Sequence, residues 1–138
     1  MVEFYEWGWG ASFHFAPRAK SESFAASEAR HEHVIALKLG LRPGMHVMDL
    51  GAGVGGPARE IARFSGAKIT GCNINEYQLM RLAEEAKRQK LDHLVDGRLA
   101  DYHKLPFADN SMDGGYQIEA FCHATDLKKV YSEAFRVI

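Results

Sequence analysis

The sequence has few cysteines, no long apolar run and almost no net charge, and each shortage excludes a class of protein. Its two cysteines, Cys72 and Cys122, are too few and too scattered for a disulfide framework or a zinc site, and no metal site is predicted. The net charge of -1 lacks the basic excess of a nucleic-acid-binding protein. The short apolar runs cannot cross a membrane, and no secretory signal begins the chain. We therefore expect an intracellular, cytoplasmic protein.

The 138 residues suffice for one domain, and their pattern alternates strands with helices. Predicted strands cover 45–50, 67–72, 94–100 and 112–120, and predicted helices cover 21–40, 57–66, 75–88 and 127–138. This alternation indicates an α/β fold, with a parallel sheet and helices on both of its faces.

Two of the predicted helices carry a stripe that should face the core. In helix 21–40 the stripe is Phe24, Ser27, His31, Val34, Ile35 and Leu37, and in helix 127–138 it is Leu127, Val130, Tyr131 and Ala134. At the start of helix 75–88, Asn75 and Gln78 have the spacing of a capping pair.

A glycine turn joins the first strand to the helix that follows it. Gly51, Gly53 and Gly56 form a G-x-G-x-x-G pattern there, which in this setting is typical of a nucleotide site at a helix N-terminus. Three glycines in six residues cost chain entropy, and we expect no packing gain to compensate for it. A ligand is therefore favoured over a plain tight turn.

The charges around the turn indicate which nucleotide it would hold. A dinucleotide site needs an acidic residue after the second strand, and Asn73 stands there instead. Asp49, two residues before the first glycine, would repel a pyrophosphate but would attract a ligand carrying an ammonium and a sulfonium. S-adenosylmethionine is such a ligand, so it is preferred over NAD.

Several separate motifs occur in an order that resembles one enzyme family. "VMDLGAGVGG", "ITGCNINEYQL", "LPFADNSMD" and "YQIEAFCHATD" resemble the class I S-adenosylmethionine-dependent methyltransferases, which have a Rossmann-like fold. Adding "YEWGWGASFHFA" narrows the resemblance to sterol 24-C-methyltransferases. It implies a methyl transfer to the side-chain double bond of a sterol, in sterol biosynthesis.

The resemblance also implies roles for individual residues. Asp49, Gly51 and Gly53 would border the methionine half of the cofactor. Asn73 and Gln78, with Ile74 beside them, would hold the ribose. Asp101, preceded by Ala100, would accept a hydrogen bond from the adenine amino group, although a turn residue leaving the third strand explains it equally well. Glu119 would face the sulfonium and the substrate from the end of the fourth strand.

The implied reaction forms a carbocation and then releases a proton. Aromatic faces stabilise a cation without forming a bond to it, which suits Tyr5 as a catalytic group and Trp7, Trp9 and Phe13 as substrate-binding groups. Glu119 is the first candidate for the base and His123 the second, although His123 also fits an ordinary loop residue. The arm of residues 1–20 is either a lid over the ligand or a segment pinned on the core, and residues 21–138 form the cofactor domain.

The chain stops where relatives in the family continue. It would hold strands in the order 3-2-1-4 only, an incomplete parallel sheet whose fourth strand is an edge. We expect either a fragment of a longer enzyme or self-association through that edge.

Two other functions stay open, and so do two partners. A cyclopropane fatty acid synthase-like enzyme or another small-lipid methyltransferase is one alternative, and a non-catalytic S-adenosylmethionine-binding fragment is the other. A sterol or other lipid is the expected substrate. A peripheral contact with the endoplasmic reticulum membrane follows from the lipid substrates of the family, and no nucleic acid is expected.

Overall fold

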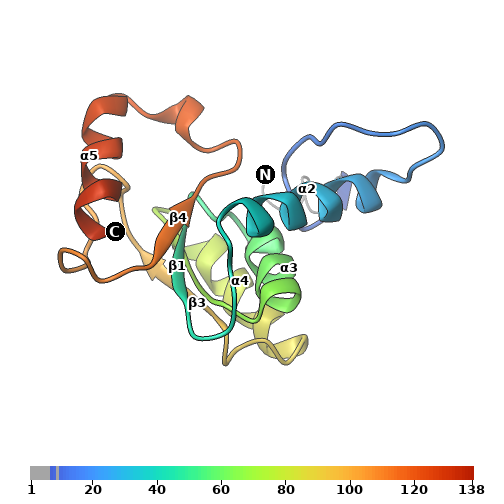
Figure 1. The fold of residues 1–138 in the computed structure, drawn as a ribbon, viewed down its shortest axis with the longest axis horizontal. Helices are drawn as coiled ribbons and strands as arrows, with labels where there is room; N and C mark the ends of the chain where they lie inside the picture. The colour runs from blue at the N-terminus through green and yellow to red at the C-terminus, as the bar shows by residue number, and fades with distance from the viewer. Residues whose placement is uncertain (1–6, 9) are drawn as a thin grey trace.

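Four parallel strands form the centre of the structure, a computed structural model that describes residues 7, 8 and 10–138. The strands are β1 (His46–Leu50), β2 (Lys68–Asn73), β3 (Val95–Leu99) and β4 (Gly114–Tyr116). They lie in the order β3-β2-β1-β4, which confirms the predicted order (Figure 1). Because all pairs are parallel, the carboxyl ends of the strands meet at one edge of the sheet.

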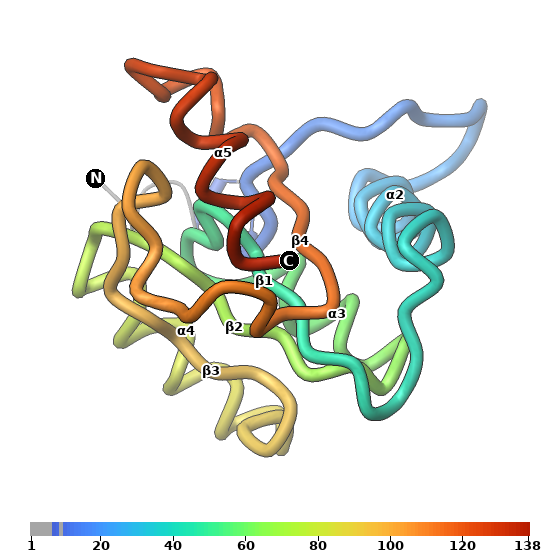
Figure 2. The backbone as a smooth tube through the Cα atoms, turned by 60° about the vertical axis from the view of Figure 1, so that its left-hand side comes forward, coloured from blue at the N-terminus to red at the C-terminus, as the bar shows by residue number. Residues whose placement is uncertain are grey.

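Helices cover both faces of this sheet, as predicted for a Rossmann-like fold. α2 (Phe24–Lys38), α3 (Gly56–Ser65) and α4 (Glu76–Arg88) lie on one side, and α5 (Leu127–Val137) lies on the other (Figure 2). A single 3-10 turn, η1 (Phe121–His123), precedes α5. Within the described part of the chain, no helix has the length and apolar character needed to span a membrane.

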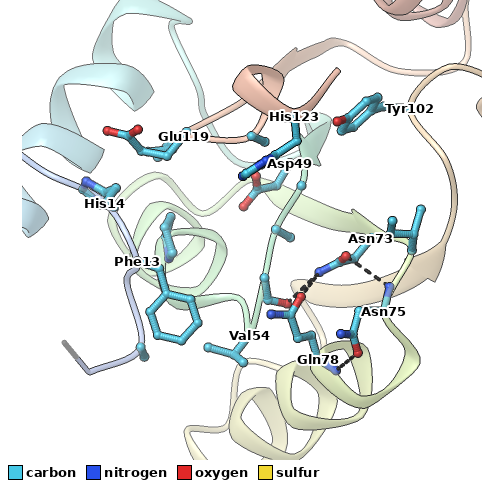
Figure 3. A pocket seen from close by; sticks show the side chains of 18 residues that line it. Phe13, His14, Asp49, Val54, Asn73, Asn75, Gln78, Tyr102, Glu119 and His123 are labelled. Atoms are coloured by element: carbon cyan, nitrogen blue, oxygen red, sulfur yellow. Dashed lines mark hydrogen bonds between the residues drawn. The ribbon is translucent and has the colours of Figure 1, made fainter. Parts of the chain in front are cut away.

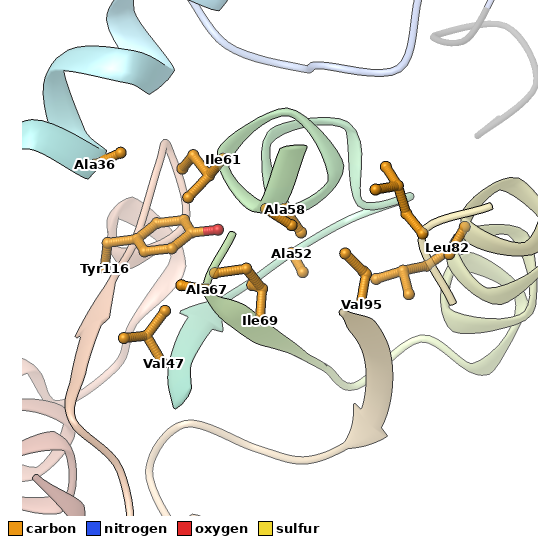
Figure 4. Packing of buried hydrophobic residues seen from close by; sticks show 13 residues of the cluster. Ala36, Val47, Ala52, Ala58, Ile61, Ala67, Ile69, Leu82, Val95 and Tyr116 are labelled. Atoms are coloured by element: carbon orange, nitrogen blue, oxygen red, sulfur yellow. The ribbon is translucent and has the colours of Figure 1, made fainter. Parts of the chain in front are cut away.

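Alternation along the strands divides the core into two clusters. Val47, Ile69 and Tyr116 point to the side of α3 and α4, where they pack with Ile61 and Leu82 (Figure 4). The strand residues that alternate with these point to the other side of the sheet. There Met48, Leu50 and Cys72 pack with Val137 of α5. This period of two is what a strand covered on both faces requires.

The fourth strand is shorter than predicted, and this moves Glu119. β4 ends at Tyr116 rather than extending to residue 120. The Gln117 side chain accepts hydrogen bonds from the backbone N–H groups of Ala120 (3.0 Å) and Phe121 (3.2 Å), and this turns the chain away from the sheet. Glu119 has φ of 55°, a left-handed conformation that a strand does not contain. The prediction that Glu119 ends the fourth strand is therefore wrong.

The buried side of α2 matches the predicted stripe only in part: Ser27 is buried and Ile35 packs against the core. The helix buries Ser27, Glu28, Glu32 and Ala36, whereas Val34 and Leu37 are 39% and 68% exposed. The stripe prediction counted apolar residues, but α2 packs against α3 and the segment that precedes it, and that segment supplies polar partners for the buried glutamate Glu32. The physical reason is that a hydrogen-bonded carboxylate can be buried where an unpaired one cannot.

α5 also differs from its predicted stripe. Val130 and Val137 are fully buried, but Leu127 and Tyr131 are 49% and 61% exposed. The described sheet ends at β4, so no further strand lies beneath the outer part of this helix. Its apolar surface is therefore only partly covered.

Candidate functional site

A cavity of about 640 Å³ lies at the carboxyl ends of the strands, and it brings most of the predicted site residues together (Figure 3). β1 and the glycine turn provide one wall, the start of α4 a second, the turn after β4 a third, and residues 11–14 a fourth. The predicted residues that line it are Phe13, Asp49, Gly51, Gly53, Asn73, Ile74, Gln78, Glu119 and His123. Ligands of open α/β sheets bind at this edge.

The glycines of the turn are required by packing as well as by backbone conformation. Gly51 has φ of 89°, and a Cβ added to it would lie 2.3 Å from the Cβ of Ala120. A Cβ on Gly56 would lie 2.1 Å from the carbonyl oxygen of Ala11. The expectation that these glycines bring no packing gain is therefore wrong, because the turn is pressed between two other segments. The same contacts hold the turn in place at the base of the cavity.

Asp49 is the most perturbed carboxyl group of the cavity. It is 2% exposed, and its Oδ2 atom is buried without a hydrogen-bond partner. Burial raises the pKa of Asp49 to about 7; the Tyr116 hydroxyl opposes this shift and the carboxylate of Glu32 adds to it. An unpartnered buried acid has a large desolvation penalty unless a ligand supplies a counter-charge.

Asn73 and Gln78 form a polar network at the start of α4. The Asn73 amide donates to Oε1 of Gln78 (2.8 Å) and to the carbonyl of Gly53 (3.4 Å). Asn75 caps the helix by accepting from the Gln78 N–H (3.1 Å), as predicted. A capping pair would also have the Gln78 side chain accept a hydrogen bond from the Asn75 N–H, and this part of the prediction is wrong. The Asn75 N–H donates to Asn73 (3.2 Å), and the Gln78 side chain bonds to Asn73 as well. The network orients both amides beside the glycine turn.

The wall opposite this network comes from residues that the sequence interpretation missed. His14 lines the cavity and is 3% exposed, and its Nε2 lies 3.0 Å from Oε1 of Glu32. The Ser12 hydroxyl donates to the same oxygen at 2.8 Å. Burial lowers the pKa of His14, but its bonds to Glu32 and to the carbonyl of Phe15 outweigh burial and the net shift is upward. The available signal was Glu28 and Glu32, two acids one helical turn apart beside apolar residues.

Two candidate proton acceptors lie on different parts of the rim. Figure 3 shows Glu119 on the same side of the cavity as His14, and His123 beside Asp49. Glu119 is exposed and stands in the strained turn after β4, while His123 belongs to η1. The rings of Phe13 and Tyr102 complete the lining from opposite sides. Their roles in chemistry stay predictions.

Several predicted residues do not line this cavity. Asp101 accepts hydrogen bonds from the His103 backbone (2.8 Å) and imidazole (2.7 Å), which fits its alternative interpretation as a turn residue. Ala100 is buried beneath it in the α5-side cluster. Trp7 is 86% exposed and is not part of the lining, so its substrate contact stays a prediction. The predictions for Tyr5 and Trp9 lie outside the described residues.

Neither cysteine is among the described residues that line the cavity. Cys72 is buried on β2, on the α5 side of the sheet, Cys122 is exposed, and both are free. Over the described residues, no three His, Cys, Asp or Glu side chains are placed to hold a metal ion.

Comparisons with known proteins agree with the geometry. The chain is 52% identical to a cycloartenol-C-24-methyltransferase of Arabidopsis thaliana over 137 residues, which are 99% of this chain and 41% of that protein. It is 50% identical to a sterol 24-C-methyltransferase of Saccharomyces cerevisiae over 138 residues, 100% of this chain and 36% of that protein. The chain thus spans about two-fifths of the length of the curated relatives it matches.

The fold is also that of solved methyltransferase structures. A protein of Galdieria sulphuraria described as a sarcosine dimethylglycine methyltransferase superposes with a TM-score of 0.91 at 29% identity, over 99% of this chain and 55% of that one. The family model described as a methyltransferase domain matches residues 48–138, from β1 through α5. The chain therefore belongs to the methyltransferase domain family.

Proposed function

We propose that this chain is the S-adenosylmethionine-binding part of a sterol 24-C-methyltransferase, which methylates the side-chain double bond of a sterol in sterol biosynthesis. The identity of about one half to two sterol-type methyltransferases, over nearly the whole chain, supports this substrate class. The arrangement of the cavity supports the cofactor.

The observation that carries the proposal is the buried carboxyl group of Asp49. Its Oδ2 has no partner, and it lies beside a turn whose glycines a larger residue could not replace. A phosphate at this place would be repelled once Asp49 ionises, whereas an ammonium or sulfonium would provide the missing counter-charge. Asn73 and Gln78 fit the neutral, hydroxyl-bearing ribose, since their amides are oriented at the cavity edge.

Bound S-adenosylmethionine supplies an electrophilic methyl group on a sulfonium. The chain's own residues then have three tasks. Asp49 and the glycine turn would hold the donor at the base of the cavity, so that its methyl group could be oriented toward an alkene. Phe13 and Tyr102 exclude water and offer ring faces to the cation that forms on the sterol. After a hydride shift, Glu119 accepts the proton that leaves, with His123 as the second candidate.

A titration followed by a product assay tests this proposal. Calorimetry with S-adenosylmethionine should show binding, and a radiolabelled methyl group should appear in an added sterol. Transfer to an unsaturated phospholipid instead would support the cyclopropane fatty acid synthase-like alternative. An absence of binding would contradict every reading in which the cavity holds this cofactor.

A non-catalytic binding fragment is the second candidate, and the short sheet favours it. β4 has three residues and pairs with β1 alone among the described strands, and the chain spans about two-fifths of its curated relatives. Binding of the cofactor without any methylated product would support this candidate for the chain by itself.

Contacts beyond the cavity are part of the same proposal. Copies of the chain associate through the β4 edge, beside which Tyr131, Phe135 and Ile138 expose apolar surface. A strictly monomeric species in equilibrium sedimentation at high concentration would contradict this. We also propose a cytoplasmic protein that lies peripherally on the endoplasmic reticulum membrane, because its proposed substrate is a lipid. Co-flotation with phospholipid vesicles tests that contact.

A further inference from the structure

Two kinds of contact hold the segment of residues 10–15 against the rest of the fold. Backbone packing holds its start, because the carbonyl of Ala11 occupies the space where Gly56 has no side chain. Polar contacts hold its middle, where Ser12 and His14 both bond to Glu32 of α2. Phe13 lies between these two anchors, with its ring over Gly53 and facing Val54 across the cavity (Figure 3).

Glu32 receives these bonds in an environment that is unfavourable for a carboxylate. It is 2% exposed, and its neighbour Glu28, one helical turn earlier, is 7% exposed. A buried carboxylate is tolerated when hydrogen bonds and an opposite charge replace its water. Glu32 bonds to residues 12 and 14, which are 20 and 18 positions away in sequence. Displacement of the segment would therefore remove both of these hydrogen bonds from Glu32.

Glu28 provides the contrast that makes this arrangement specific. It lies on the same buried side of α2 and its charge also acts on His14, but its Oε1 has no hydrogen-bond partner among the described residues. The contrast between the two acids that matters here is that Glu32 accepts hydrogen bonds from residues 12 and 14. If a buried acid on α2 were sufficient to hold the segment, substitutions of Glu28 and Glu32 would have the same effect on it.

We propose that Glu32 is a positioning residue for the cavity, which by accepting bonds from Ser12 and His14 holds Phe13 and His14 in place as its fourth wall. Glu32 does not line the cavity. Its hydrogen bonds act on the cavity through this wall, and its charge also reaches Asp49. The identity of the ligand rests on the proposed function, whereas the fastening of the segment does not. The sequence offers a spectroscopic readout, because both tryptophans of the chain, Trp7 and Trp9, directly precede the segment.

The test compares Glu32→Met with Glu28→Met in the whole chain. Both changes replace a buried acid by an apolar side chain of similar length, but only the first removes the bonds to Ser12 and His14. Without any cofactor, we expect Glu32→Met to lower the steady-state fluorescence anisotropy of the tryptophans and Glu28→Met to leave it unchanged. Glu32→Gln retains an acceptor and should give an intermediate anisotropy, and it decides the question if Glu32→Met does not fold.

Cofactor affinity provides the second readout. We expect Glu32→Met to raise the dissociation constant for S-adenosylmethionine about tenfold, with Glu32→Gln in between and Glu28→Met near wild type. Folded Glu32 variants with unchanged anisotropy, or an equal loss in Glu28→Met, would overturn the positioning role. Failure of the wild type to bind the cofactor would instead overturn the proposed function, and the anisotropy comparison would still decide the role of Glu32.

Discussion

The two sides of the cavity are built in different ways. The side formed by Asp49, the glycine turn and the start of α4 consists of two short, continuous motifs, each following a strand. The side formed by residues 11–14 has no regular secondary structure and depends on Glu32 from another element. The first side was predicted residue by residue, and the second was predicted only as an aromatic arm. Sequence motifs therefore identify the part of a site that is built from residues close together in the sequence.

The largest effect should come from a change in the glycine turn itself. Gly51→Ala adds a Cβ that would overlap Ala120, at a φ of 89° that side chains rarely adopt. We expect the free energy of unfolding to fall by about 3 kcal/mol or more, measured by urea denaturation. Gly114→Ala is the matched control, because its added Cβ would meet Val47 at an ordinary 3.5 Å. Equal denaturation midpoints for the two variants would show that the close approach of the turn to Ala120 is unimportant.

Asp49→Asn should weaken cofactor binding by about tenfold or more, since it removes the charge that faces the cation. The pKa of about 7 of Asp49 in the folded protein also determines how cofactor affinity depends on pH. The wild type should bind more tightly as pH rises through about 7, where Asp49 ionises, and the variant should show a flat profile. Calorimetric titrations between pH 5.5 and 8.5 measure both. Equal affinity in the two proteins at high pH would remove Asp49 from the site.

The same carboxyl group gives an independent prediction on stability. Its pKa is raised from 3.8, so the folded state retains a proton that the unfolded state has lost between about pH 4 and pH 7. This group therefore lowers stability as pH rises through that window. Asp49→Asn should be more stable than wild type at pH 8 and nearly equal to it at pH 4, as measured by thermal denaturation without cofactor. If Asp49→Asn were instead less stable than the wild type at pH 8, the titration of Asp49 would not control the pH dependence of stability.

The network at the start of α4 should matter less, because its members are neutral. Asn73→Ala removes the bonds to Gln78 and to the Gly53 carbonyl, and we expect the cofactor dissociation constant to rise about three- to tenfold. Gln89→Ala, at the far end of α4, provides a control with another hydrogen-bonded amide. Identical affinities for the two variants would indicate that the network only caps the helix.

The smallest effect is expected from removing a single ring on the side of residues 11–14, with the hydrogen bonds to Glu32 left in place. Phe13→Ala should raise the same dissociation constant only a few-fold, about 1 kcal/mol or less, because the hydrogen bonds of Ser12 and His14 would still hold the backbone. Phe15→Ala, at a ring that is 65% exposed, should have no measurable effect. A loss for Phe13→Ala as large as for Asp49→Asn would reverse the ranking of the two sides.

The order of the strands followed from the family resemblance, and the motif side of the cavity followed from the sequence itself. Hydrophobic alternation, the spacing of glycines and the placement of Asp49, Asn73 and Gln78 are local properties, and the sheet then brings their carboxyl ends together. Asp101 was assigned to the adenine by resemblance; its side chain bonds to His103, two residues away, and its contact with the adenine stays a prediction.

Tertiary structure alone decided the rest. The length of β4 depends on the Gln117 side chain, which bonds the next turn and so stops the strand. The buried face of α2 depends on Ser12 and His14, without which Glu32 would have faced water. In both places a hydrogen bond from a polar side chain decides the outcome, to the next turn at β4 and to residues 18 and 20 positions away at α2. A pattern of apolar residues along the chain does not record such bonds.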